Sequence, residues 1–277
     1  MTTQRALLHV ALPSLVALSA CQGSPAPASA PMTARGAARS ETAHATEVTT
    51  RVLVEDGGAV RHYAVSAHGS ASGPLPLVLV FHGGGMSGEA MRTYADLESR
   101  ASSPAIFVYP DAVVRNVWAD EYALHWDGTR DLAFVDHVVR GLLENGQVDA
   151  KRVYAFGLSS GAYFVNQLAC AWGKRLAGFV AVEGGGPYGD CNGATSAMIV
   201  HDPADPVVPA SEGKESLTRW LTEDRCPSEI ATPSHAPPGC VARACALGTR
   251  VVTCSPAAGV HAIGPSVREN ALRFFGL

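Results

Sequence analysis

The chain has 277 residues, of which 47% are hydrophobic and 17% are charged, so it can bury the core of one ordinary globular domain. Its formal net charge at pH 7 is -4, and it has no cluster of basic residues, which argues against a nucleic-acid-binding protein. The sequence shows no internal repeat and no second domain. We therefore expect one globular domain, and we expect it to be a monomer.

The first twenty residues predict an export signal rather than part of the fold. Arg5 precedes an apolar run, Ala6 to Ala17, that is too short to span a bilayer comfortably. The run leads into Leu18-Ser19-Ala20-Cys21, and small residues before a cysteine resemble the lipobox of bacterial lipoproteins. The resemblance implies cleavage before Cys21, diacylation of its sulfur and a lipid anchor at the bacterial cell envelope. The alternative is an ordinary secretory signal, which would leave the protein secreted.

The segment that follows predicts a linker. Residues 21–46 begin at the candidate lipidated cysteine and are rich in Ala, Ser, Pro, Gly and Thr. Such a composition buries too little apolar surface to offset the entropy of ordering, so we expect a disordered tether. The folded domain is then expected over residues 47–277.

The cysteines predict disulfide bonds. Without Cys21 an even set of six is left, with no spacing typical of a zinc site. Disulfides form in oxidising compartments, which agrees with export. We expect Cys170 to pair with Cys191, because each closes an element next to the central turn described below. The four others should pair among themselves, in an order that the sequence leaves open: Cys226, Cys240, Cys245 and Cys254.

Strands and helices alternate along the rest of the chain. The expected strands are 48–54, 61–65, 77–81, 105–109, 152–156, 177–182, 197–200 and 249–254. The expected helices are 90–101, 131–144, 162–170, 211–222 and 266–275. This alternation predicts an α/β fold, a doubly wound and mostly parallel sheet with helices on both faces. In such sheets the functional site lies beyond the carboxyl ends of the strands.

The most informative motif lies between the strand 152–156 and the helix 162–170. The strand follows a polar turn at 149–151, and it runs into Gly157-Leu158-Ser159-Ser160-Gly161. A Gly-x-Ser-x-Gly turn between a strand and a helix is the nucleophile elbow, which exposes the serine hydroxyl at the end of the sheet. The N-terminus of the following helix offers backbone N–H groups to a developing oxyanion. Ser159 is therefore the candidate nucleophile.

A second glycine-rich turn predicts an oxyanion hole. The strand 77–81 leads directly into His82-Gly83-Gly84-Gly85, a motif whose backbone N–H groups hold the substrate oxygen in esterases. Glycine is needed there because a Cβ would block the approach of the backbone to the substrate. We expect N–H groups near Gly83 and Gly84, together with that of Ser160, to form the hole.

An acid and a histidine should follow the nucleophile in that order along the chain. The strand 197–200 leads into a loop with two aspartates, of which Asp202 stands closer to the strand. We favour Asp205, mostly because of the family resemblance given below. His261 follows the last strand and is the candidate base. The rivals are His235, in a proline-rich loop, and His201, which precedes the acid and fits better as a packed loop residue.

These residues resemble the secreted α/β-hydrolase esterases of carbohydrate esterase family one, together with polyhydroxybutyrate depolymerases and feruloyl esterases. The resemblance covers the chain from about residue 48 to the end. Its matching segments are Leu79–Gly83, Val108–Asp111, Trp126–Asp136, Arg152–Ser159, His201–Pro209 and the cysteine series that precedes His261. It implies the α/β-hydrolase fold and a serine esterase that needs no metal and no organic cofactor.

The resemblance says less about the substrate. The cysteine series is closer to feruloyl esterases, so the expected substrates are feruloyl or acetyl esters of plant polysaccharide. Polyhydroxyalkanoate is the alternative, and a catalytically silent lipoprotein that binds an envelope polymer is a third hypothesis. The chain departs from the family at His201-Asp202-Pro203 and at Ala262, where the family has His-Gly-Thr and usually an aromatic or proline. Trp118, Tyr122 and Trp126 are candidates for an aromatic wall around the substrate.

Overall fold

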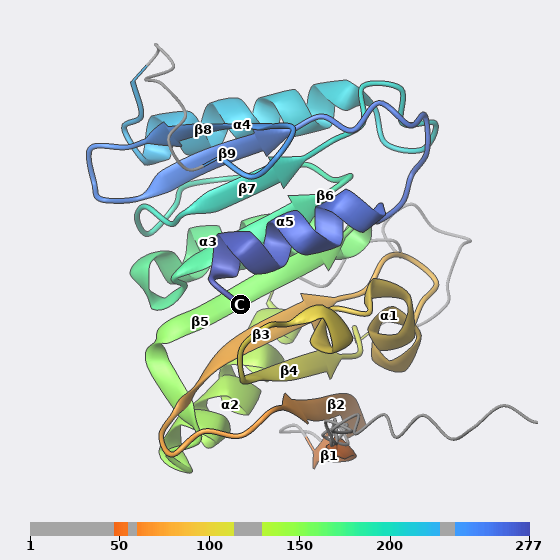
Figure 1. The fold of residues 1–277 in the computed structure, drawn as a ribbon, viewed down its shortest axis with the longest axis vertical. Helices are drawn as coiled ribbons and strands as arrows, with labels where there is room; N and C mark the ends of the chain where they lie inside the picture. The colour runs from red at the N-terminus through yellow and green to blue at the C-terminus, as the bar shows by residue number, and fades with distance from the viewer. Residues whose placement is uncertain (1–46, 55–59, 114–128, 228–235) are drawn as a thin grey trace, which may run out of the picture. The chain divides into compact units, whose positions relative to one another are not determined.

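The computed structural model describes residues 47–54, 60–113, 129–227 and 236–277 (Figure 1). These residues belong to one compact unit, Ala43–Leu277. None of the helices in these ranges combines the length and the apolar character that a membrane span requires.

A single sheet organises the fold. In the described ranges it has nine strands in the order β1-β2-β4-β3-β5-β6-β7-β9-β8. The strands are β1 (Glu47–Val54), β2 (Val60–His68), β3 (Leu75–Phe81), β4 (Ala105–Pro110), β5 (Val148–Leu158), β6 (Gly178–Val182), β7 (Ala197–Val200), β8 (Cys240–Ala244) and β9 (Arg250–Cys254).

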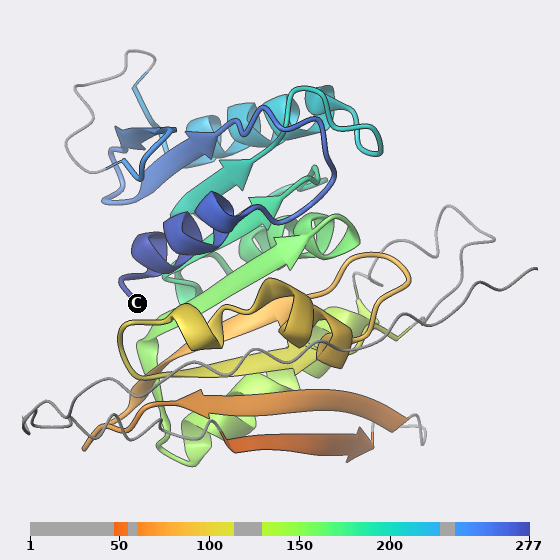
Figure 2. The same ribbon diagram turned by 45° about the vertical axis from the view of Figure 1, so that its right-hand side comes forward.

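The centre of the sheet is parallel and its edges are antiparallel. The strands β4, β3, β5, β6, β7 and β9 run in one direction. At one edge β1 pairs with β2 and β2 with β4, and at the other edge β8 pairs with β9, all antiparallel. Figure 2 shows these edges at opposite ends of the sheet, with β1 in orange-red and β9 in blue. The carboxyl ends of the central strands therefore meet at one side of the sheet, as expected.

Helices cover both faces of the sheet and bury a separate core on each (Figure 1). The helices are α1 (Gly88–Ala95), α2 (Arg130–Glu144), α3 (Ser160–Trp172), α4 (Ala210–Glu223) and α5 (Pro265–Phe275). One core joins the sheet to α2, α3 and α4 through side chains such as Phe134, Leu168 and Trp220. The other joins it to α1 and α5 through Met91, Val267 and Phe275. The continuous apolar character of β3, β4 and β6 follows from burial on both faces.

The structure differs from the expected elements in three places. Residues 149–151 lie inside β5, where the Asp149 carboxylate accepts a hydrogen bond from the Lys151 N–H, and the register with β3 shifts at this point. The expected helix 90–101 is divided into α1 and a short 3₁₀ helix, η1 (Glu98–Arg100), because Asp96 adopts a left-handed conformation. Strand β8 was not expected, since its half-buried residues show no clear apolar pattern.

Three disulfides stabilise this unit. Cys170 in α3 bonds Cys191, the pairing that the sequence predicts. The other four cysteines pair among themselves, Cys226 with Cys245 and Cys240 with Cys254. The last of these joins the first residue of β8 to the last residue of β9, so it closes the edge of the sheet covalently.

Asp224 gives a prediction on stability. It is fully buried after α4, and its carboxylate accepts a hydrogen bond from the Thr195 N–H. Burial raises its pKa to about 6, so folding favours the protonated form and stability is lost as pH rises from about 4 to about 6. We expect Asp224→Asn to raise the free energy of unfolding by about 1–3 kcal/mol at pH 8, with little or no gain at pH 4.

Urea unfolding at both pH values measures this difference. The exposed Glu215 in α4 supplies a control, and Glu215→Gln should change the free energy of unfolding by less than about 0.5 kcal/mol at either pH. An equal effect of Asp224→Asn at pH 4 and pH 8 would contradict the assignment of a raised pKa.

Candidate active site

The nucleophile elbow forms at the carboxyl end of the central strand. Ser159 lies between β5 and α3 with φ 54° and ψ -119°, a strained conformation for a residue with a side chain. Its N–H donates to the carbonyl oxygen of Val182, at the end of the neighbouring strand β6. Its own carbonyl accepts from Ala162 and Tyr163 in the first turn of α3. Packing on both sides of the turn thus maintains the strained serine.

The two glycines of the elbow are required because backbone atoms lie against them. A Cβ at Gly157 would lie 2.1 Å from the carbonyl oxygen of Gly161, and a Cβ at Gly161 would lie 2.3 Å from that of Phe81. Phe81 is the last residue of β3, so Gly161 lets α3 begin directly against the neighbouring strand. The elbow therefore brings the start of α3 and the end of β3 into contact.

A prediction follows for Gly161. Because backbone atoms cannot yield as a flexible side chain can, Gly161→Ala should lower the free energy of unfolding by about 3 kcal/mol. Gly141 in α2 is a matched control, since nothing lies within 4 Å of a Cβ placed there. Gly141→Ala should stabilise the protein by about 0.5–1 kcal/mol through its gain in helix propensity. Thermal unfolding of both variants checks the pair, and a stable Gly161→Ala protein would contradict the packing argument.

The glycine turn after β3 lies beside the nucleophile. A Cβ at Gly83 would lie 3.5 Å from the Cβ of Ser159, and Gly83, Gly84 and Ser160 all line the same cavity as Ser159. Ser160 begins α3, where backbone N–H groups have no acceptor within the helix. The structure thus brings all three candidates for the oxyanion hole to the serine.

His82 orients this glycine turn. Its ring is buried, and its Nε2 accepts a hydrogen bond from the Ala112 N–H, so the proton lies on Nδ1. Nδ1 then donates to the carbonyl oxygen of Gly83 at 2.8 Å. Because a peptide unit is planar, fixing that carbonyl also fixes the direction of the Gly84 N–H. His82 therefore acts on the candidate oxyanion hole through the backbone.

The candidate acid and base are in direct contact. The Nδ1 of His261 lies 2.7 Å from Oδ2 of Asp205, whose side chain is buried. Oδ1 of Asp205 accepts hydrogen bonds from the N–H groups of Val207 and Val208. Burial raises the pKa of Asp205, but these hydrogen bonds, with that of His261 first among them, outweigh it and leave the pKa below its usual value. Asp205 is therefore an oriented carboxylate beside the histidine.

His261 and Ser159 both line one cavity of about 470 Å³. No hydrogen bond links these two side chains among the residues that the structure describes, and in resting enzymes such bonds are often long. The rest of the wall is largely apolar and includes Met86, Tyr94, Leu158, Tyr163, Val207, Val208 and Pro209. The cavity thus combines a nucleophile and a base with an apolar surface.

Asp202, the rival acid, has a different place. Its carboxylate accepts hydrogen bonds from the N–H groups of Ala204, Ala258 and Gly259. These bonds, first that of Ala204, lower the pKa of Asp202. Asp202 therefore ties the loop after β7 to the loop that carries His261, two residues beyond Gly259, and it does not contact the histidine ring in the way that Asp205 does.

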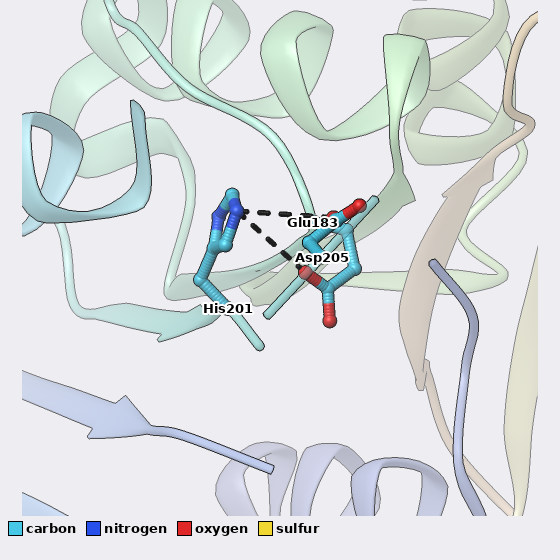
Figure 3. A group of neighbouring side chains, drawn as sticks. All are labelled: Glu183, His201 and Asp205. Carbon is cyan, nitrogen blue, oxygen red and sulfur yellow. Dashed lines mark ion pairs between the residues drawn. The ribbon is translucent and has the colours of Figure 1, made fainter. Parts of the chain in front are cut away.

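Glu183 is a buried acid that the sequence analysis did not single out. It follows β6 directly and lies beside Asp205 and His201 (Figure 3). A charged residue at the carboxyl end of a strand of five buried residues is the signal that could have found it. His201 itself is a buried loop residue whose Nε2 bonds the carbonyl oxygen of Val208.

The same three side chains could be considered as metal ligands, because one atom of each lies within 4.8 Å of the others. Their atoms already have partners in the protein. Asp205 bonds His261, the ring of His201 bonds Val208, and Glu183 accepts from the Asp202 N–H. The donor set therefore fits a hydrogen-bonded cluster better than a metal site.

Other sequence expectations lie outside the described residues. These are the aromatic wall candidates Trp118, Tyr122 and Trp126, the rival base His235 and the lipidation candidate Cys21. Among the described residues, an aromatic pair that the sequence analysis did not select lies at the cavity: Tyr163 of the wall stacks on the exposed Tyr188, with ring centroids 6.5 Å apart.

Curated relatives of the chain are esterases by name. It is 30% identical over 179 residues to the probable feruloyl esterase C of Aspergillus niger, covering 61% of this chain and 63% of that protein. It is also 30% identical to feruloyl esterase C of Emericella nidulans, over 61% and 64% of the two chains. The bifunctional acetylxylan esterase/xylanase XynS20E of Neocallimastix patriciarum is 24% identical over 65% of this chain and 26% of its own length. The chain thus spans a little under two thirds of the feruloyl esterases, and no protein-family model matches it.

Solved structures share the fold. The acetyl xylan esterase from Aspergillus awamori superposes with a TM-score of 0.61 at 12% identity, over 82% of this chain and 99% of that one. The feruloyl esterase module from Clostridium thermocellum superposes with a TM-score of 0.59 at 10% identity, over 83% and 88%. With its mostly parallel sheet and helices on both faces, the chain has the α/β-hydrolase fold.

Proposed function

We propose that this protein is a serine esterase that hydrolyses carboxylic esters through an acyl-enzyme. The observation that carries the proposal is the placement of Ser159 and His261 on one cavity, with Asp205 bonded to the histidine at 2.7 Å. Such a set of nucleophile, base and orienting acid is the arrangement of serine hydrolases on several unrelated folds. The esterase names of the sequence relatives support the same conclusion.

Each residue then has one role in the reaction. His261 removes the proton of the Ser159 hydroxyl as the oxygen attacks the ester carbonyl, and Asp205 stabilises the imidazolium that forms. The N–H groups near Gly83 and Gly84 and that of Ser160 donate to the developing oxyanion. His261 returns the proton to the leaving alkoxide, and it then activates the water that releases the acid. No metal or organic cofactor enters these steps.

We propose feruloyl or acetyl esters of plant polysaccharide as the substrates. Relatives named feruloyl esterase and acetylxylan esterase support this class. The apolar wall with Tyr94 and Tyr163, and the Tyr188 ring stacked on Tyr163, would suit a flat phenolic acyl group. Polyhydroxyalkanoate is the second candidate, since an apolar cavity also accommodates a short aliphatic chain.

A panel of three substrates tests the function and the substrate class together. Methyl ferulate and acetylated xylan should release acid faster than hydroxybutyrate oligomers, and a fluorophosphonate probe should label the wild-type protein. Preferred hydrolysis of the oligomers would replace the polysaccharide substrate with polyhydroxyalkanoate. A protein that binds a glycan and never reacts with the probe would instead support the silent binding protein.

We further propose that the enzyme is exported and held at the bacterial envelope through Cys21. The three disulfides support an oxidising compartment, and the sequence Leu18-Ser19-Ala20-Cys21 supports lipidation. In a bacterial host, labelled palmitate should enter the full-length protein and be lost in Cys21→Ser. Labelling that persists in this variant would remove the anchor from the proposal.

A further inference from the structure

Glu183 has a strained backbone conformation. It follows β6 with φ 53°, in the left-handed region that a residue with a side chain rarely adopts. Its N–H donates to the carbonyl oxygen of Val200, and its side chain is 1% exposed. A strained backbone that aims a buried acid at a candidate site is unusual unless the acid has a role there.

Three neighbours face this carboxyl group. The Asp202 N–H lies 3.2 and 3.0 Å from its two oxygens. The carboxyl group of Asp205 lies on another side, with an oxygen within 4.8 Å of an oxygen of Glu183. The Nε2 of His201 lies 3.7 Å from Glu183 and 3.8 Å from Asp205, on the side shown by the dashed lines in Figure 3.

His201 does not supply a proton for a hydrogen bond between the carboxyl groups of Glu183 and Asp205. Its Nε2 lies 3.1 Å from the carbonyl oxygen of Val208, closer than to either carboxyl group, so the N–H donates to Val208. Its Nδ1 has no hydrogen-bond partner among the described residues. A hydrogen bond between the carboxyl groups of Glu183 and Asp205 must therefore use a proton that one of the two acids carries.

The surroundings assign that proton to Glu183. Both oxygens of Asp205 already accept hydrogen bonds, from His261 at Oδ2 and from Val207 and Val208 at Oδ1. Within the described part of the chain, the Glu183 oxygens accept only from the Asp202 N–H. The electrostatics agree: burial raises the pKa of Glu183 to about 8 in spite of the hydrogen bond from the Asp202 N–H, which lowers it, and the neighbouring Asp205 adds to the rise. The pKa of Asp205 is lowered.

We propose that Glu183 is a positioning residue of the active site, whose protonated carboxyl group donates a hydrogen bond to Asp205 and so fixes the carboxylate that orients His261. This inference rests on the proposed function, because it assumes that Asp205 and His261 act in ester hydrolysis. Glu183 itself does not line the cavity that holds Ser159 and His261. Its action passes through Asp205 alone.

The proposal predicts an alkaline decline in activity. The titratable groups near the pair are His201, Asp202, His261 and, from α3, Tyr163, and no lysine or arginine of the described residues forms an ion pair with Glu183 or Asp205. Loss of the Glu183 proton therefore removes a donor and places a second, uncompensated charge beside Asp205. At pH 9 only about one tenth of Glu183 keeps its proton, so kcat/KM should fall up to about tenfold between pH 7 and pH 9.

Two substitutions separate positioning from simple packing. Glu183→Gln keeps the shape and an N–H donor for Asp205 at every pH, so activity near wild type at pH 7 is expected, without the alkaline decline. Glu183→Ala removes the donor and should lower kcat about 10- to 100-fold at pH 7, with KM nearly unchanged. Asp224→Asn is the matched control, since it also neutralises a buried acid but should leave the pH profile as in the wild type.

The test has a readout that does not depend on hydrolysis. In a Ser159→Ala background, the carboxyl carbon of Glu183 is followed by ¹³C NMR from pH 5 to pH 10, with and without Asp205→Asn. A titration near pH 8 that shifts when Asp205 is replaced is expected. A Glu183 already ionised at pH 6 would overturn the inference. So would an active wild type whose alkaline decline persists in Glu183→Gln, whereas a wild type that fails to hydrolyse esters while Glu183 titrates as expected would refute only the proposed function.

Discussion

Replacing Ser159 with alanine is expected to lower kcat for p-nitrophenyl acetate by about 10,000- to 1,000,000-fold and to abolish labelling by a fluorophosphonate. In the proposed mechanism the Ser159 hydroxyl forms the acyl-enzyme, at the strained turn between β5 and α3. Alanine keeps the Cβ and the backbone of the elbow. The cavity and the oxyanion donors should therefore persist, and substrate binding should change little.

Stability and a second serine control this experiment. The melting temperature of Ser159→Ala should match or exceed that of the wild type, because removing a hydroxyl that serves activity commonly leaves stability unchanged or raises it. Ser211→Ala, at an exposed position of α4, should leave kcat within about twofold. Turnover that persists undiminished in a folded Ser159→Ala protein would remove this residue as the nucleophile.

Replacing Asp205 with asparagine should lower kcat by about 10,000-fold while the fold stays intact. In the wild type, His261 Nδ1 lies 2.7 Å from a carboxylate oxygen of Asp205. The amide keeps the size of the carboxylate, but it presents a neutral group to this nitrogen. The histidine then loses both the charge that stabilises the imidazolium and the acceptor that selects its tautomer. Initial rates with p-nitrophenyl acetate and the ¹⁵N shifts of His261 measure the two losses separately.

Asp202→Asn is the decisive comparison for the acid. Its carboxylate accepts from the backbone of Ala204, Ala258 and Gly259, so the amide should loosen the loop before His261. We expect a lower melting temperature and a reduction in kcat of about tenfold, far less than for Asp205→Asn. A larger loss of kcat for Asp202→Asn would show that the acid had been chosen wrongly.

The parallel centre of the sheet could be predicted from sequence because its strands carry their own signal. Continuous apolar runs such as 77–81 occur only where both faces are covered, and the glycine turns that end β3 and β5 mark the edge where the site lies. Strand β8 escaped prediction because it lies at an edge. Its pairing with β9 and its disulfide, rather than any apolar pattern, place it in the sheet.

The functional site divides in the same way. The turn around Ser159 and the order of acid and histidine after it can be read along the chain, and together with the family resemblance they nominated Ser159, Asp205 and His261. What Glu183 and Asp202 do depends on which strands are neighbours and on how two loops wrap around each other. Glu183 contacts Asp202 because β6 pairs with β7, and the residues next to Glu183 in the sequence do not predict that pairing. Such contacts are set by tertiary packing.

The disulfide between Cys240 and Cys254 implies that the two parts of the proposed catalytic site differ in their resistance to unfolding. Ser159 follows β5 at the centre of the sheet, whereas His261 lies seven residues after Cys254, the last residue of β9, which is the second strand from one edge and has only β8 beyond it. Heat or a thiol reductant should therefore inactivate the enzyme by releasing the histidine loop while the central strands are still folded. The working lifetime of the catalyst would then be set by the fraying of one edge, and a second brace there would prolong it more than any improvement to the core.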